Sequence, residues 1–222
     1  NEVTTNISFL SNPPPQLQPS GPLKNITPND IKRLSISTPL TTEQYLNDEI
    51  VTATLRLMQL HSPHNTTRHV LSSYFFTTLL SGGPNPHSFF QRQRTRTPTY
   101  RPPRNASTLL IPIVRNLHWH LIIRHQETYY CVDSGGNHHI TPNKQQEYDL
   151  ITTSPAHIPS HHNNSALRPL RAFTQRDQIN CGVFLLLHAY VFLYHPNPLT
   201  YNWANQPTDI ATNFRHFILT SL

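Results

Sequence analysis

The chain has 222 residues, enough for one domain with a substantial core, and its formal net charge is +6. The absence of any run of about 18 apolar residues argues against a membrane span. The presence of only two cysteines argues against a secreted, disulfide-stapled domain. We therefore expect free thiols and an intracellular location, in the cytoplasm or nucleus. A basic surface also suits an acidic partner, either protein or nucleic acid.

The N-terminal part of the chain predicts an extended lead-in followed by one helix. Residues 1–26 are rich in Pro, Asn and Ser, which is typical of a segment without a packed core, and a single domain is expected over 27–222. Thr27 and Pro28 predict the start of the first helix, because Thr caps a helix well and Pro suits its first position.

Two longer helices are predicted next, one from Thr42 and one over about 68–80. Each rests on apolar residues that recur at steps of three and four. The apolar positions are Leu46, Ile50, Ala53, Leu57 and Leu60 in the first, and Val70, Leu71, Tyr74, Phe75 and Leu79 in the second. Residues 81–106 show no period and are rich in arginine, which predicts a long basic loop or insertion.

Three strands are predicted over residues 108–114, 119–124 and 128–133. The first is almost continuously apolar, as in a strand buried on both faces, but Pro112 within it indicates a sheet edge or a bulge. A Ser-Gly-Gly turn follows at 134–136. Residues 137–166 are polar and predict a loop with little regular structure, and 168–174 is a candidate fourth strand.

The most apolar segment, Cys181 to Tyr194, predicts a buried central helix. A last helix is predicted over 209–219, with Ile210, Phe214, Phe217 and Ile218 facing inward. Helices gathered around a mostly antiparallel sheet predict an α+β domain.

A candidate reactive centre lies at the start of the central helix. The dipole of the helix favours a thiolate at Cys181, and Gly182 would allow a substrate backbone to come close. A small buried residue at the start of a core helix fits Cys181 equally well. If the strands before and after residue 126 form a hairpin, His118 and Asp133 meet at one end of the sheet, where Asp could orient the imidazole. Gln175 could supply an amide donor for an oxyanion.

These residues occur in motifs that resemble the ubiquitin-like-protein-specific cysteine proteases, which include the SUMO proteases, bacterial effector deubiquitinases and, more remotely, the adenovirus protease. The matching segments are Tyr45-Leu46-Asn47-Asp48, Phe75 to Leu79, Leu109 to Ile113, His118 to Leu121, Val132-Asp133-Ser134, Gln175, Cys181 to Phe184, and Phe214-Arg215. Together they cover about residues 28–222 in the order His, Asp, Cys.

The resemblance implies a papain-like core of the adenovirus-protease type, with Cys181 as nucleophile, His118 as base and Asp133 as orienter. It also implies that Gln175 serves the oxyanion. Tyr45, Asp48 and Trp119 are the implied substrate contacts, and Tyr45 and Trp119 would bound a channel for a Gly-Gly tail. Tyr45 stands where the family usually has Trp, Asn180 where it often has Asp, and residues 81–106 are unlike the SUMO-protease segment.

His120, Cys131 and the other histidines have less favoured roles. His120 is the fallback base, because it lies two residues from His118 on the same strand face. Cys131, inside a predicted strand, is expected in the core. Fifteen histidines suggest a metal, but no zinc motif is complete, so scattered surface histidines are expected, with no metal and no cofactor.

The function implied is a protease or isopeptidase that cleaves after the C-terminal Gly-Gly of ubiquitin or a SUMO-like modifier. The alternatives are a protease that processes a viral or mobile-element polyprotein, and an acetyltransferase on the same triad, for which no acyl-coenzyme A signature is visible. We expect a monomer that meets its modifier through Arg92, Arg94 and Arg96, with nucleic acid as the less favoured partner. For a secreted effector, the location would be the host cell.

Overall fold

The computed structural model describes residues 26–36, 39–81, 106–136, 139–153, 166–204 and 206–222. The lead-in predicted over 1–26 lies outside these residues except for Ile26, and so does the basic insertion apart from its end residues. Arg92, Arg94 and Arg96 therefore lie outside the described part of the chain. None of the described helices is long and apolar enough to cross a membrane.

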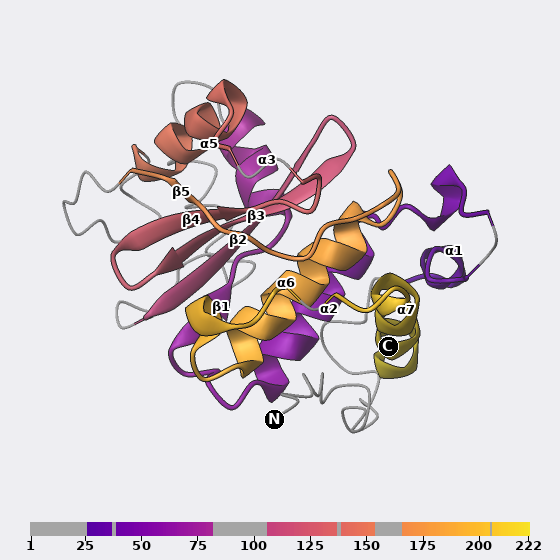
Figure 1. Ribbon diagram of the computed structural model, residues 1–222. Coiled ribbons are helices and arrows are strands. Elements are labelled where there is room, and N and C mark those ends of the chain that lie inside the picture. The colour runs from indigo at the N-terminus through magenta and orange to yellow at the C-terminus, as the bar shows by residue number, and fades with distance from the viewer. Residues whose placement is uncertain (1–25, 37–38, 82–105, 137–138, 154–165, 205) are drawn as a thin grey trace, which may run out of the picture.

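The described part of the chain forms a five-stranded sheet flanked by helices (Figure 1). The strands are β1 (Arg68–Val70), β2 (Thr108–Arg115), β3 (His118–His125), β4 (Thr128–Val132) and β5 (Arg168–Pro169). The helices are α1 (Pro28–Lys32), α2 (Asp48–His61), α3 (Tyr74–Ser81), α5 (Pro142–Thr152), α6 (Cys181–Tyr194) and α7 (Ile210–Ser221), with short 3₁₀ turns at Thr42–Gln44 and Pro198–Thr200.

The strands lie in chain order across the sheet. The central pairs β2–β3 and β3–β4 are antiparallel, whereas the short outer strands β1 and β5 pair in parallel with β2 and β4. The predicted α+β class with a mostly antiparallel sheet is confirmed. Pro112 pairs with Leu121 of β3, and β1 reaches only as far as Leu110. Pro112 lacks a backbone N–H, but this breaks no hydrogen bond to β1, because β1 does not extend that far. At Pro112, strand β2 is therefore locally at the edge of the sheet, as the sequence predicts.

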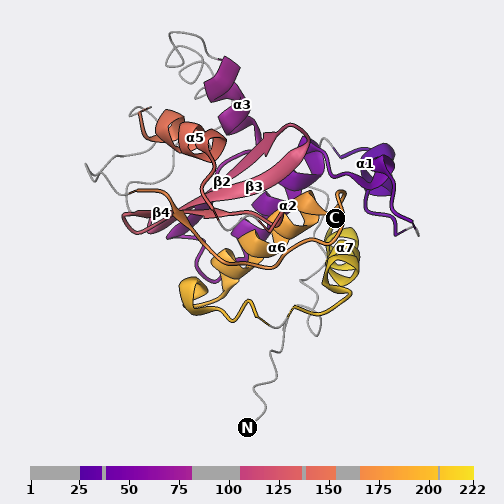
Figure 2. The same cartoon turned by 45° about the horizontal axis from the view of Figure 1, so that its top comes forward.

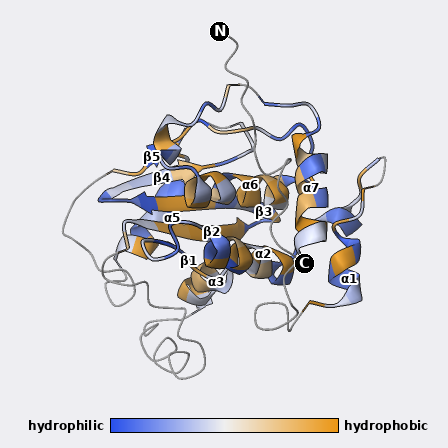
Figure 3. Ribbon diagram, turned by 90° about the horizontal axis from the view of Figure 1, so that it is seen from below, coloured by the Kyte–Doolittle hydropathy of each residue, from blue (hydrophilic) through white to orange (hydrophobic). Residues whose placement is uncertain are grey.

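Each face of the sheet carries its own core. Helices α2, α6 and α7 cover one face, and α3 and α5 cover the other (Figure 1). Alternate residues of β3 divide between the two, since Leu121 and Ile123 face the α6 side while Ile122 faces α3 and α5. Helix α6 is buried along almost its whole length, as its composition predicts. The apolar side of α7 is turned toward α6 (Figure 3).

The start of α1 is confirmed and that of α2 is corrected. Thr27 and Asp30 form a reciprocal capping box with Pro28 at the first helical position. Helix α2 begins at Asp48 rather than Thr42, because the Asn47 side chain accepts the N–H of Ile50 and so caps the helix there. Leu46 is buried although it lies outside the helix, and Leu60 is 58% exposed rather than part of the apolar side.

Three further predictions differ from the structure. The helix expected over 68–80 divides into β1 and α3, because Arg68 to Val70 pair with β2 instead. Residues 137–166 contain the helix α5, which starts at Thr141 and Pro142 with the same signal as α1, so the sequence did carry it. The fourth strand predicted over 168–174 is only two residues long.

Candidate active site

The N-terminal end of α6 carries a buried thiol. Cys181 is fully buried, its Sγ lies 4.0 Å from the Leu117 carbonyl oxygen, and it sits at the positive end of the helix dipole. Leu117 belongs to the turn between β2 and β3, where both it and Asn116 adopt positive φ angles. This turn delivers the next residue, His118, to the end of α6.

His118 and Asp133 meet at the same end of the sheet, as predicted. His118 opens β3 and Asp133 follows the last residue of β4, and the antiparallel pairing of these strands brings the two together. His118 Nε2 lies 2.7 Å from Asp133 Oδ1, so Nδ1 is the nitrogen left for another partner. Hydrogen bonding to Asp133, and next to Cys181, raises the pKa of His118 to about 9. Asp133 is therefore the hydrogen-bond partner of the imidazole, and Cys181 influences its pKa.

The Asp133 carboxylate has partners beyond His118. Lys144 of α5 forms a buried ion pair with Oδ2, and the N–H of Gly135 donates to Oδ1 at 2.8 Å. Burial acts to raise the pKa of Asp133, but the hydrogen bonds from His118 and Lys144 outweigh it and hold that pKa well below its usual range. The sequence predicts a loop over residues 137–166 and so gives no indication of the role of Lys144.

Leu46, Trp119 and Gly182 pack tightly beside Cys181. The Trp119 indole N–H donates to the Leu46 carbonyl at 2.9 Å, and only 1% of Trp119 is exposed. A Cβ on residue 182 would lie 3.0 Å from Leu46 Cβ and 3.2 Å from Trp119 Cδ1. Gly182 is therefore needed for the close packing of Leu46 and Trp119. The sequence analysis explains this glycine by the approach of a substrate backbone, whereas the structure shows a packing requirement.

Tyr45 and Asp48, the other two predicted substrate contacts, lie just before α2 and in its first turn. The Tyr45 ring is half-buried, whereas its hydroxyl is fully buried. Burial, and then the nearby Cys181, raises the pKa of Tyr45. Burial also raises the pKa of Asp48, whose Oδ1 has no hydrogen-bond partner among the described residues.

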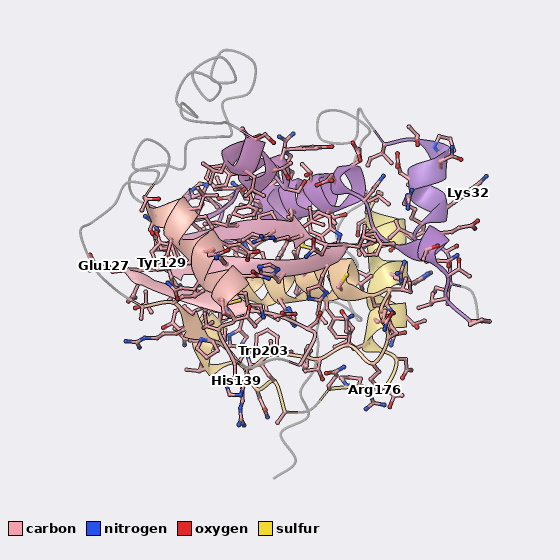
Figure 4. All side chains as sticks on the ribbon, turned by 90° about the horizontal axis from the view of Figure 1, so that it is seen from above. Lys32, Glu127, Tyr129, His139, Arg176 and Trp203 are labelled. Carbon is pink, nitrogen blue, oxygen red and sulfur yellow. The ribbon has the colours of Figure 1, made fainter. Side chains whose placement is uncertain are left out.

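Gln175 is anchored next to the turn that follows Asp133. Its Oε1 accepts the Ser134 hydroxyl at 2.7 Å, and its Nε2 donates to the Asp177 carbonyl at 2.7 Å. No hydrogen bond joins Gln175 to Cys181 within the described part of the chain. The loop reaches the surface at Arg176, at the end of the molecule opposite Glu127 (Figure 4).

Arg215 connects α7 to the residue before the thiol. Only 1% of Arg215 is exposed, and burial lowers its pKa to about 10. Its Nε donates to Asn180 Oδ1 at 2.8 Å, while its two terminal nitrogens donate to the carbonyls of Arg33 and Gln44. Helices α1 and α7 accordingly lie side by side (Figure 2). Phe214-Arg215 is one of the segments that resemble the family motifs, but its contacts are visible only in the structure.

The fallback residues are occupied elsewhere. His120 Nε2 lies 2.8 Å from Glu147 Oε2, and both side chains are buried, so His120 interacts with α5. Cys131 lies in the core on the α5 side, as predicted, where burial raises its pKa to about 12. Within the described ranges, no three His, Cys, Asp or Glu side chains are placed to hold a metal ion.

Comparison with known proteins identifies the fold. No family model and no curated protein sequence matches the chain. Among solved structures, the C-terminal protease domain of Ulp1 bound to Smt3, the yeast orthologue of SUMO, is 19% identical with a TM-score of 0.63, and the match covers 88% of this chain and 81% of that one. A de-sumoylating protease is 17% identical with a TM-score of 0.64, covering 87% and 85% of the two chains.

A bacterial protein is also similar. The Xanthomonas campestris effector XopD, in a structure bound to ubiquitin, is 16% identical with a TM-score of 0.53, and the match covers 78% of this chain and 90% of that one. The chain therefore has the fold of the Ulp1-type proteases that its motifs resemble, and the predicted protease fold is confirmed.

Proposed function

We propose that this chain is a cysteine protease or isopeptidase that cleaves after the C-terminal Gly-Gly of ubiquitin or a ubiquitin-like modifier. The main support is the position of His118, which lies 2.7 Å from Asp133 and directly follows Leu117, the residue whose carbonyl contacts the Cys181 thiol at the start of a buried helix. The fold adds support, because structures with the same fold were solved in complex with Smt3 and with ubiquitin.

In the proposed mechanism, His118 Nδ1 takes the proton of the Cys181 thiol, and the thiolate attacks the carbonyl carbon of the terminal glycine. His118 then returns the proton to the leaving amine, and water releases the acyl group from sulfur. Asp133 holds the imidazole through Nε2 and stabilises its protonated form without taking the proton itself. Gly135 and Lys144 fix the orientation of Asp133.

The oxyanion of the tetrahedral intermediate would be stabilised by Gln175 and a backbone N–H near Cys181. An amide nitrogen carries two hydrogens, and one of them is used on the Asp177 carbonyl, so the second can serve the oxyanion. Ser134 holds the other end of the same amide. The Gln175 side chain would then be oriented before substrate arrives, which lowers the reorganisation needed in the transition state.

The substrate tail would pass between Tyr45 and Trp119. Because Trp119 is buried beneath Leu46 and Gly182, it would support the channel rather than offer a free ring face. Such a channel admits a tail without side chains. Asp48, which is only partly buried in the first turn of α2, would contact the modifier.

Modifier choice would depend on surfaces away from the channel. We favour ubiquitin over SUMO, since Tyr45 and residues 81–106 depart from the SUMO-protease pattern. Arg92, Arg94 and Arg96 would meet an acidic surface of the modifier, in preference to nucleic acid. We further propose that the enzyme acts as a monomer inside cells.

Probes made of ubiquitin or SUMO with a thiol-reactive group at the C-terminus test this function. We expect a covalent adduct with the wild-type chain and with Cys131→Ala, and none with Cys181→Ala. If neither probe forms an adduct while iodoacetamide still alkylates Cys181, the proposed substrate class is wrong although the thiol is reactive. This result would favour a polyprotein protease or an acetyltransferase.

A further inference from the structure

The residues that lead to Gln175 lie outside any helix or strand. Phe173, Thr174 and Gln175, which we call the oxyanion segment, come between β5 and α6, and all three are at least partly buried. Backbone N–H and C=O groups in such a segment have no sheet partner, and leaving them unpaired away from water is costly. The oxyanion segment must therefore take its hydrogen bonds from other parts of the chain.

The side-chain amide of Gln206 bonds to both backbone groups of Thr174. The Thr174 N–H donates to Gln206 Oε1 at 2.8 Å, and Gln206 Nε2 donates to the Thr174 carbonyl at 2.7 Å. A primary amide carries its acceptor and its donors next to each other, so it can pair with a backbone residue as a residue of a neighbouring strand does. Gln206 thus takes the place of a strand beside the residue that precedes Gln175.

The residues on both sides of this pairing are held as well. His188 Nε2 lies 3.1 Å from the Phe173 carbonyl oxygen, and because a carbonyl can only accept, Nε2 carries the proton. The Gln175 N–H donates to the Ser134 carbonyl at 2.8 Å. One end of the oxyanion segment is therefore tied to α6, the other end to the turn after β4, and the middle to Gln206.

Aromatic packing supports the part of the chain that carries Gln206. The Trp203 ring meets Phe173 edge-on, with ring centroids 5.1 Å apart, and Tyr201 meets Trp203 with centroids 4.7 Å apart. Aromatic pairs in this arrangement add stability beyond the area they bury. The chain before α7 therefore packs against the oxyanion segment through its rings as well as through the Gln206 amide.

We propose that Gln206 is a positioning residue for the reaction: by holding Thr174 it fixes the backbone from which the Gln175 amide reaches the oxyanion. This role rests on the proposed cysteine-protease function and adds a residue that lies outside the motifs shared with the family. Gln206 acts through Gln175. Because Ser134 and Asp177 also anchor the Gln175 side chain, loss of Gln206 should displace that amide slightly and not release it.

The test compares Gln206→Ala with Gln59→Ala. Gln59 of α2 is a matched control, because its side-chain amide also holds a backbone group: it accepts the Val70 N–H at 3.0 Å, on β1 at the edge of the sheet opposite β5. Gln206→Ala should lower kcat on a fluorogenic ubiquitin or SUMO substrate by roughly 10-fold with little change in KM, since a displaced donor loses part of its interaction with the transition state. Gln59→Ala should leave kcat unchanged.

A double substitution separates positioning from a general structural role. If Gln206 acts through Gln175, Gln206→Ala should cause no further loss of kcat in a Gln175→Ala background. Alkylation of Cys181 by iodoacetamide forms no oxyanion, so in a Cys131→Ala background its rate should be the same with and without Gln206→Ala. A wild-type kcat in Gln206→Ala, or an equal loss of kcat with Gln175 present and absent, would overturn the proposal.

Amide hydrogen exchange tests the same contact without a substrate. The Thr174 N–H should exchange faster in Gln206→Ala than in the wild-type chain, and Gln59→Ala should not change its rate. An unchanged rate in Gln206→Ala would show that Gln206 does not hold Thr174, and would overturn the proposal. A wild-type chain that cleaves neither modifier would instead contradict the proposed protease function, so the two failures are distinguishable.

Discussion

Lys144 and Asp133 form a buried ion pair through Oδ2, the carboxylate oxygen that His118 does not use. Their side chains are 9% and 8% exposed. Lys144 is one of only three lysines in the chain, and it comes from a helix on the opposite face of the sheet from α6. Asp133 is therefore held between the imidazole and a second cation.

Replacing Lys144 should destabilise the protein. Lys144→Met removes one of the two basic groups that contact the Asp133 carboxylate, and breaking a buried pair from one side costs about 3 kcal/mol or more. Urea unfolding at pH 7 measures the loss, and Lys32→Met, at an exposed lysine of α1, is the control. The Asp133 pKa is depressed, so its contribution is present above the ordinary carboxyl pKa and is lost as the pH falls. An unfolding free energy equal to that of Lys32→Met would contradict this role.

Replacing His118 and replacing His120 should have different effects on activity. His118→Ala should lower kcat/KM by roughly 10²-fold or more, because general-base assistance and thiolate activation are lost. His120→Ala should instead reduce stability, since buried Glu147 would keep only its longer contact with Arg115, and the remaining folded enzyme should keep most activity. If folded His120→Ala is inactive while His118→Ala is active, the general base is His120 and not His118.

The pH dependence of stability should report on His118. Its folded-state pKa of about 9 lies above the ordinary 6.5, so protonation of His118 stabilises the fold fully below pH 6.5. This contribution disappears as the pH rises through about 9. The difference in unfolding free energy between wild type and His118→Ala should shrink between these two values, as measured by urea unfolding. A difference that stays constant over this range would show that the pair with Asp133 is not charged.

Gln175 should affect the transition state and not the binding of substrate. Gln175→Ala is expected to lower kcat by roughly 10²-fold with little change in KM, because the amide interacts with charge that develops only during the reaction. Steady-state kinetics on a fluorogenic ubiquitin substrate measure both constants. A change confined to KM would assign Gln175 to binding alone.

The arginines outside the described residues should affect whole modifiers and spare short peptides. Neutralising Arg92, Arg94 and Arg96 together should raise KM for ubiquitin and flatten its salt dependence, because surface charge contacts are screened by salt. If these arginines contact only the body of the modifier, the kinetics of a short peptide that ends in Gly-Gly should not change. Equal effects on peptide and protein would place these arginines near the channel.

A modifier that ends in Gly-Ala or Ala-Gly should be cleaved far more slowly than one that ends in Gly-Gly. The close packing of Leu46, Trp119 and Gly182 leaves no room for a Cβ at residue 182 itself, and we expect the same restriction for a tail beside it. Matched fluorogenic substrates that differ only in the tail provide the measurement. Equal cleavage rates would rule out a narrow channel.

The sequence alone determined the features that depend on neighbouring residues. The Thr27-Pro28 cap, the three central strands and the apolar helix α6 follow from local propensity and periodicity, and the structure has them where they were expected. The meeting of His118 with Asp133 follows from a hairpin, which is also a local feature.

Only the tertiary structure decided the features that depend on residues far apart in the chain. Residues 68–70 form a strand because β2 is available as a partner, although their own pattern favours a helix. Lys144 reaches Asp133, and Arg215 reaches the carbonyls of Arg33 and Gln44, through folding that no spacing encodes. The burial of the Tyr45 hydroxyl has the same origin. Hydrogen bonds and ion pairs of buried groups are determined by which surfaces pack together, and a linear pattern of residue types does not contain that information.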